Sequence, residues 1–228
     1  MARMRRSIGD RFSKAPLRRR AMGDATVILS SVGSSSFASV PSSIREPLLV
    51  ALTTRVVRRV KEEPAIPASV LLPLVDRGGV VHVWLTRRPQ TMRRHRGQVA
   101  FPGGKRDPGE SALEAALREA DEELGFSPSM VDVLGGLDAL VTTTGFAISP
   151  FVGWLRDDVE ARPNVAEIAR AFCVPLGAFV FAEPRPHLLR GSGITRIAPS
   201  YAVDGEIVWG ATARIMGDLV KLVRRVIA

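Results

Sequence analysis

A run of acidic residues between Arg118 and Glu123 contains the side chains best suited to chemistry in this sequence. If the run is helical, Glu119, Glu122 and Glu123 lie within about one turn on one face of the helix. Three carboxylates this close repel one another, so a fold keeps them together when cations neutralise their charge. Carboxylate oxygens are hard ligands that favour Mg²⁺ or Mn²⁺ over softer metals. The run therefore predicts a divalent-metal site, and a solvated acidic helix face is the alternative.

The residues around this run fill a longer pattern of glycine, acidic, basic and apolar positions at fixed spacing. In order, they are Gly104, Glu110, Arg118, Glu119, Ala120, Glu122, Glu123, Gly125 and Phe126. The pattern resembles the Nudix box, G-x5-E-x7-R-E-U-x-E-E-x-G-U, in which U is an apolar residue. Only Ala120 is small for its position. A solvated acidic helix would not explain the glycines at both ends.

The residues that flank the acidic run predict where its helix begins and ends. Ser111 and Glu114 have the spacing of a capping box, and Gly125 stands where a left-handed residue ends a helix. The alanines between them form a slim apolar stripe, which lets the helix pack closely against a sheet. Arg118 precedes Glu122 by one turn and is therefore placed to orient a carboxylate ligand.

The resemblance to Nudix enzymes implies hydrolysis of a nucleoside diphosphate that is linked to a further group. It assigns Mg²⁺ or Mn²⁺ to Glu119, Glu122 and Glu123, with one of the three as a candidate base, and it makes the carbonyl of Gly104 a further metal ligand. Metal ions neutralise the diphosphate and acidify the attacking water. Glu110 is expected to support the loop and the helix electrostatically.

A further acidic residue downstream, Glu167, matches a position at which Nudix enzymes carry an extra metal ligand or a general base. The segment from Asn164 to Ile168 is expected to open a short helix, so an exposed glutamate at a helix start is the alternative. Residues 133–137 and 148–153 read as two strands joined by a turn-rich segment. In similar proteins a loop at this place borders the active site.

The stretch before the box, residues 84–104, resembles the signature of coenzyme A diphosphatases, L-L-T-x-R-[S/A]-x3-R-x3-G-x3-F-P-G-G. The matching residues are Leu85, Thr86, Arg88, Arg93, Gly97, Phe101, Pro102, Gly103 and Gly104, whereas Trp84 and Pro89 depart from it. Five arginines lie between residues 87 and 96, and their planar guanidinium groups match phosphate oxygens. The resemblance makes Arg88 and Arg93 phosphate ligands and includes Thr86, Gly97 and Phe101 in the substrate site. A solvated basic loop, or cationic partners for the box carboxylates, is the alternative.

The two motifs together predict hydrolysis of the diphosphate of coenzyme A or acyl-CoA. The products would be adenosine 3′,5′-bisphosphate and 4′-phosphopantetheine or its acyl derivative. The first alternative is a Nudix hydrolase that acts on ADP-ribose, dinucleoside polyphosphates or other nucleoside diphosphate derivatives. The second is a silent Nudix domain that only binds, which the complete set of box carboxylates disfavours.

Length and composition indicate one catalytic domain with an N-terminal extension. The chain has 228 residues, 46% of them hydrophobic, which is enough for one ordinary core. Helical and strand patterns alternate as in an α/β (α+β) protein, and the resemblance implies the Nudix fold, an α/β/α sandwich with a mixed β-sheet. We expect residues 1–43 to be a basic, Ser-rich, disordered extension, residues 44–67 a helix and linker, and residues 68–228 the Nudix hydrolase domain.

The positive charge of the chain is confined to its N-terminal part. Residues 1–61 hold 13 Lys and Arg against 3 Asp and Glu, whereas residues 62–228 hold 19 against 20. The net charge of +9 therefore does not indicate that the catalytic domain binds nucleic acid. A small-molecule substrate is the expected partner.

The N-terminal extension allows three interpretations: a disordered tail, a targeting segment, or an arm for an anionic partner. We expect a cytoplasmic location, or the mitochondrial matrix if the segment is a transit peptide. Residues 44–61 predict a helix that packs on the domain, with a membrane-surface helix as the alternative. No apolar run approaches the roughly 20 residues of a membrane span. The single cysteine, Cys173, is expected to be a buried structural thiol.

Overall fold

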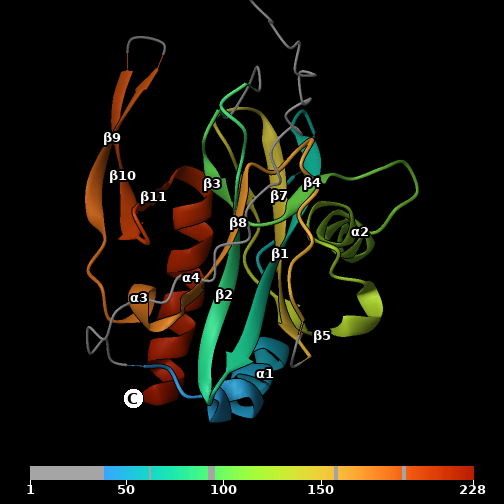
Figure 1. Cartoon of the computed structure of the whole chain (residues 1–228). Helices are drawn as coiled ribbons and strands as arrows, with labels where there is room; N and C mark the ends of the chain where they lie inside the picture. The colour runs from blue at the N-terminus through green and yellow to red at the C-terminus, as the bar shows by residue number, and fades with distance from the viewer. Residues whose placement is uncertain (1–38, 62, 92–95, 157–158, 192–193) are drawn as a thin grey trace, which may run out of the picture.

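The computed structural model describes residues 39–61, 63–91, 96–156, 159–191 and 194–228. The interpretations of residues 1–38 and the phosphate-binding role expected of Arg93 lie outside this part of the chain. The described strands form a large mixed sheet and a small second sheet, and helices cover both faces of the large one (Figure 1).

The large sheet is built around β1 (Ile66–Arg77), which is its central strand. β1 pairs antiparallel with β2 (Val80–Arg87) and β4 (Gly103–Lys105), and parallel with β7 (Phe146–Leu155). The remaining strands of this sheet are β3 (Val99–Ala100) and β8 (Arg170–Pro175) on β2, and β5 (Val131–Gly136) and β6 (Leu140–Val141) on β7. Parallel and antiparallel neighbours of one strand confirm the predicted mixed sheet.

Two layers of helices enclose this sheet. α2 (Ala112–Leu124) covers one face, while α1 (Arg45–Thr54) and α4 (Gly210–Ile227) cover the other (Figure 1). Alternate side chains of β1 serve the two layers, because successive residues of a strand point to opposite faces. Leu71 packs in the cluster under α2, whereas Leu72 packs in the cluster under α1 and α4. The predicted α/β/α sandwich is confirmed.

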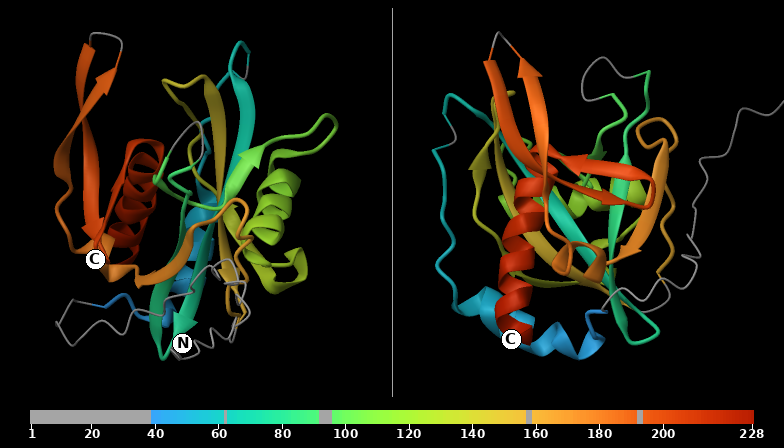
Figure 2. Two further views of the ribbon diagram at one scale, coloured as in Figure 1. Left: turned by 45° about the horizontal axis from the view of Figure 1, so that its top comes forward. Right: turned by 90° about the vertical axis from the view of Figure 1, so that its left-hand side faces the viewer.

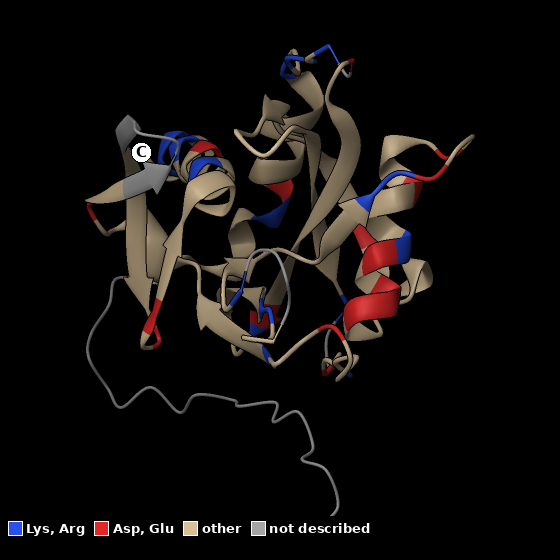
Figure 3. Cartoon of the chain, turned by 90° about the horizontal axis from the view of Figure 1, so that it is seen from above, with Lys and Arg blue, Asp and Glu red and all other residues tan. Residues whose placement is uncertain are grey.

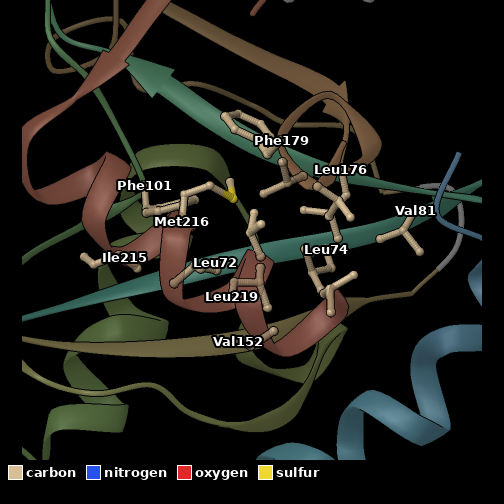
Figure 4. Close-up of a cluster of buried hydrophobic side chains, with 14 of the residues drawn as sticks. Leu72, Leu74, Val81, Phe101, Val152, Leu176, Phe179, Ile215, Met216 and Leu219 are labelled. Carbon is tan, nitrogen blue, oxygen red and sulfur yellow. The ribbon is translucent and has the colours of Figure 1, made fainter. Parts of the chain in front are cut away.

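The larger of the two hydrophobic clusters fixes α4 on the sheet. Ile215, Met216 and Leu219 of α4 lie against Leu72 and other buried side chains from the sheet (Figure 4). Burial of a side chain of this size contributes about 1.5–3 kcal/mol. The apolar stripe of α4 therefore holds the beginning of this helix close to the strands that carry the predicted site.

A second sheet lies beside α4, on the side of the molecule away from α2 (Figure 2). It consists of β9 (Arg185–Gly191), β10 (Ile194–Val203) and β11 (Glu206–Trp209), which are antiparallel. Arg170 of β8 fastens it to the large sheet through ion pairs with Asp204 and Glu206 at the β10–β11 turn. The sequence did not predict this sheet. The short helices are η1 (Ser42–Ile44), η2 (Pro128–Met130) and α3 (Gly177–Val180).

The N-terminal helix is shorter than predicted. α1 ends at Thr54, and Val56, which lies within the segment predicted to be helical, is 95% exposed. The chain leaves the helix because Arg55 pairs with Asp138 and the N–H of Arg58 donates to the same carboxylate, which draws these residues into an extended course. Leu48 and Leu52 are buried against the domain, as expected. None of the helices in the described ranges is long and apolar enough to cross a membrane.

Candidate active site

The acidic run lies in the second half of α2, which begins and ends at the residues that the sequence predicted. Some of its side chains are exposed, as at Glu122, and others face the sheet, as at Glu123. The Ser111 hydroxyl accepts a hydrogen bond from the Glu114 N–H, and the Glu114 carboxylate accepts one from the Ser111 N–H. Gly125 ends the helix in the left-handed region, at φ 71°. Acidic residues gather along α2, with basic residues beside them (Figure 3). Local capping therefore fixes which residues of the run face the sheet.

Arg118 connects most of the charged residues of the box. Its guanidinium group donates to Glu110 at 2.9 Å, to Glu119 at 3.0 Å, to Glu122 at 2.9 Å and to the carbonyl of Lys105 at 3.1 Å. The hydrogen bond from Arg118 to Glu110 holds the pKa of Glu110 below its ordinary value. Arg118 thus orients carboxylates, and Glu110 ties the loop to the helix, as the sequence predicted.

Two of the predicted metal ligands, Glu123 and Glu119, are buried or partly buried, and each has one arginine beside it. Glu123 is 2% exposed, and burial raises its pKa to about 8, against the opposing charge of Arg88. One of its oxygens lies 3.6 Å from Arg88, and the other accepts a hydrogen bond from the Gly103 N–H. Burial also raises the pKa of Glu119, although Arg118 opposes it. Carboxylates whose charge is this costly are suited to a bound cation.

The two glycines before the loop let β4 pass between β1 and α2. A Cβ atom on Gly104 would lie 2.3 Å from a carboxylate oxygen of Glu119. One on Gly103 would lie 2.4 Å from the carbonyl oxygen of Ser69, and Gly103 also has a φ of 158°. The Glu119 carboxylate therefore rests on the backbone of Gly104. Two of the groups that the sequence predicted to share a metal are neighbours.

The box carboxylates do not converge on one point in this structure. Within the described ranges, no group of three or more His, Cys, Asp or Glu side chains is close enough to hold a metal ion together. Glu122 is turned to Arg118 and its side chain is 57% exposed, whereas Glu123 is buried beside Arg88. The donors nevertheless fit a hard divalent cation, since Glu119, Glu123 and the backbone of Gly104 all offer oxygen at one end of β4.

Glu167 lies on a turn that is attached to the end of α2. The N–H of Asn164 donates to the carbonyl of Glu123, and the N–H of Arg162 donates to that of Leu124. The charge of Glu167 contributes to raising the pKa of Glu123, so the two carboxylates lie within electrostatic range. The predicted short helix is a turn, because the backbone here serves the end of α2. Glu167 is exposed and has access to water.

The signature residues divide between structural contacts and the site itself. Thr86 is buried, and its hydroxyl donates to the carbonyl of Ala100. Gly97 has a φ of 61°, so it serves the turn before β3. Arg88 pairs with Glu123, which is the alternative role that we considered for these arginines. Phe101 is buried but borders an adjoining cleft.

A cleft of about 840 Å³ opens beside the box. Arg88, Gly103, Gly104 and Lys105 line it on the side of β4. Its other lining residues are Ala68, Val70, Gln98, Val99, Ala100, Phe101, Thr142, Thr143, Thr144, Phe146, Ile148, His187, Leu188, Trp209, Gly210, Ala211, Thr212 and Ile215. Thr142, Thr143 and Thr144 belong to the turn-rich segment between residues 137 and 148, where a loop was expected to border the active site. These three residues border this cleft.

The far wall of the cleft was not foreseen from the sequence. The rings of His187 and Trp209 stack there, with their centroids 5.2 Å apart and an interplanar angle of 25°. His187 belongs to no motif, and Trp209 is one apolar residue at the end of a strand. β9 and β11 bring them together through their pairing with β10, which no local pattern reveals.

Two features outside the cleft carry no part of the predicted chemistry. A smaller cavity of about 360 Å³ lies at the β1–β2 turn and contains no residue of either motif. Cys173 is buried, and burial raises the pKa of its thiol to about 12, so it stays protonated. The interpretation of this cysteine as a structural thiol agrees with its position.

Comparison with known proteins gives the same assignment as the box. Residues 64–187 match the family model of the NUDIX domain. The chain is 41% identical over 160 residues to the Nudix hydrolase NudL of Yersinia enterocolitica, covering 68% of this chain and 80% of that protein. It is 37% identical over 159 residues to NudL of Photorhabdus laumondii, covering 69% and 84%. A MutT protein structure from Methanosarcina mazei is 25% identical, covers 54% and 86%, and gives a TM-score of 0.43.

The sheet, the capped acidic helix and these matches define one class of protein. The chain belongs to the Nudix family. It is a Nudix hydrolase, and enzymes of this family generally use divalent metal ions.

Proposed function

We propose that this Nudix hydrolase cleaves the diphosphate of coenzyme A or acyl-CoA. The products would be adenosine 3′,5′-bisphosphate and 4′-phosphopantetheine or its acyl derivative. One observation carries the proposal: the coenzyme A signature and the Nudix box meet at Arg88 and Glu123, 3.6 Å apart, at the edge of the cleft. A phosphate-binding arginine beside a buried box carboxylate suits a substrate whose diphosphate is the bond to be broken.

The metal, Mg²⁺ or Mn²⁺, would be held by Glu119, Glu122, Glu123 and the carbonyl of Gly104. When bound, it supplies a Lewis acid for the diphosphate and lowers the pKa of water. Glu123, which is buried, and Glu119, which is partly buried, fit this role because burial raises the pKa values of both carboxylates. Glu122 is less buried and would join by leaving Arg118.

The side chains around the metal ligands would position the substrate and move the proton. Arg88 would exchange its contact with Glu123 for the phosphate oxygens, because a guanidinium group binds them in a planar fork. Lys105 lines the same side of the cleft and would add a second cation. Glu167 is exposed and close enough to influence Glu123, so it is placed to accept a proton from the attacking water.

A hydrolysis panel tests this function directly. The purified full chain would be supplied with Mg²⁺ or Mn²⁺ and with coenzyme A, 3′-dephospho-coenzyme A, ADP-ribose or a dinucleoside polyphosphate. We expect coenzyme A to give the highest kcat/KM of the four. A higher value for ADP-ribose or the dinucleoside polyphosphate would replace coenzyme A with the alternative substrate class. We also propose a cytoplasmic location, in keeping with the bacterial sources of the two NudL relatives.

A further inference from the structure

The cleft beside the box has two unlike sides. β4 and Arg88 form the side next to α2, while β9, β11 and α4 form the opposite side, with β3 between them (Figures 1 and 2). The first side carries two cations, Arg88 and Lys105. Among the described residues, those that line the opposite side include no Asp, Glu, Lys or Arg.

The opposite side presents apolar and aromatic surface that the fold leaves accessible. Leu188 is 56% exposed at the mouth of the cleft, beside the stacked rings of His187 and Trp209. Ala211 of α4 continues the same wall, and Ile215, which is only 2% exposed, lies beneath it. Apolar surface that stays wet in the free protein favours a ligand that removes it from water.

The charges of the substrate decide which of its parts can reach this wall. In the proposed function, the metal ligands and Arg88 would hold the diphosphate beside Gly104. The nucleotide end of coenzyme A carries a 3′-phosphate, and placing a phosphate against an apolar wall is unfavourable without a cation. The pantetheine arm is uncharged, and in an acyl thioester it ends in a hydrocarbon chain. This arm therefore suits the wall better than the nucleotide end, whose ribose carries the 3′-phosphate.

We infer that Leu188, Trp209 and Ala211 form an apolar subsite for the pantetheine and acyl arm, which makes the enzyme prefer acyl-CoA with a medium chain over free coenzyme A. The inference rests on the proposed function. The NUDIX family model ends at residue 187, so this wall lies beyond the part of the chain that the model matches. The same catalytic box can therefore serve a substrate preference that is set elsewhere in the sequence.

Acyl-chain selectivity is the measurement that tests this subsite. For the unmodified enzyme, kcat/KM would be compared among coenzyme A, acetyl-CoA and octanoyl-CoA, all below their micelle concentrations. We expect octanoyl-CoA to exceed acetyl-CoA by about tenfold, which is a modest share of the transfer free energy of six added methylene groups. Leu188→Ser should reduce this ratio to about twofold, because kcat/KM should fall further for octanoyl-CoA than for acetyl-CoA or free coenzyme A.

A matched control and a second variant separate the subsite from the stability of the fold. Ile207→Ser removes an exposed residue of the same sheet that does not line the cleft, and the ratio should stay at the wild-type value. Trp209→Ala should act like Leu188→Ser on the ratio, with the melting temperature as a check on folding. Equal kcat/KM for acetyl-CoA and octanoyl-CoA, or an equal loss for all esters in Leu188→Ser, would refute the subsite alone. Turnover of ADP-ribose with none of any coenzyme A ester would refute the proposed function, and the subsite with it.

Discussion

The two sides of the cleft are built by different means. The α2 side consists of charged residues held by short-range hydrogen bonds, with Arg118 joined to four acceptors within one loop and one helix. The β9–β11 side consists of apolar residues that strand pairing brings together from distant parts of the sequence. The first side determines the reaction. The second side contains none of the residues proposed for the chemistry, so we propose that it determines which substrate is preferred.

The largest effect is expected from a substitution on the α2 side. Glu123→Gln should lower turnover by at least ~10²-fold while the fold stays intact, because it removes a buried metal ligand but keeps its shape. Steady-state kinetics with saturating Mg²⁺ and circular dichroism would measure this. Asp121→Asn is the control, since Asp121 is an exposed acidic residue of α2 at a variable position of the box. Near-normal rates in Glu123→Gln would end the metal-ligand assignment.

The second prediction concerns the attachment of the β9–β11 sheet to the large sheet. Arg170→Met leaves Asp204 and Glu206 without their main cation, so the free energy of unfolding should fall by about 2 kcal/mol, less than for a fully buried pair. Turnover of coenzyme A by the folded variant should change little, because Arg170 lines neither the box nor the cleft. Urea unfolding would measure the loss, with Lys221→Met as an exposed ion-pair control. If turnover fell as far as in Glu123→Gln, the two sides would not be independent.

The third prediction uses the close approach of Gly104 to Glu119. Gly104→Ala places a methyl group 2.3 Å from a Glu119 oxygen, so the carboxylate must move. We expect metal affinity or activity to fall by about tenfold, the low end of the effect of misplacing a ligand. An Mg²⁺ titration of activity would show this. Gly136→Ala is the control, because its new Cβ would meet its nearest atom at 3.7 Å. Equal behaviour of the two variants would contradict the placement of Glu119.

The smallest expected effect is a dependence of stability on pH. The folded protein raises the pKa of Glu123 from 4.5 to about 8, so the folded state binds this proton more tightly than the unfolded state. Stability from this group is therefore present at low pH and is lost as the pH rises from about 4.5 through 8. In chelator, the melting temperature of the unmodified protein should fall by at least a few degrees more than that of Glu123→Gln between pH 5 and 8.5, since 1 kcal/mol corresponds to roughly 2–4 °C. Parallel curves would show that Glu123 is ionised at its ordinary pKa.

The sequence predicted the α2 side well because its signals are local. Ser111, Glu114 and Gly125 fix the helix by contacts within a few residues, and the box spacing then places the carboxylates. In these places, propensity, pattern and capping agree.

The sequence failed where contacts between distant segments decide the structure. Asp138 ends α1 early by binding Arg55, although the helical pattern continues beyond that point. His187 and Trp209 meet only because β10 lies between their strands. Neither the second sheet nor the apolar wall has a periodic signature that differs from an ordinary core strand. Tertiary pairing supplies what local patterns lack.

The attachment of the Glu167 turn to α2 has a mechanical consequence. The N–H groups of Asn164 and Arg162 donate to the last carbonyls of the helix, so we expect the turn and the helix to move as one rigid unit. Thermal motion of this unit should therefore leave the distance between the Glu123 and Glu167 residues nearly unchanged. Heating should therefore inactivate the enzyme and unfold it at the same temperature, without an earlier range in which an intact fold has lost its activity.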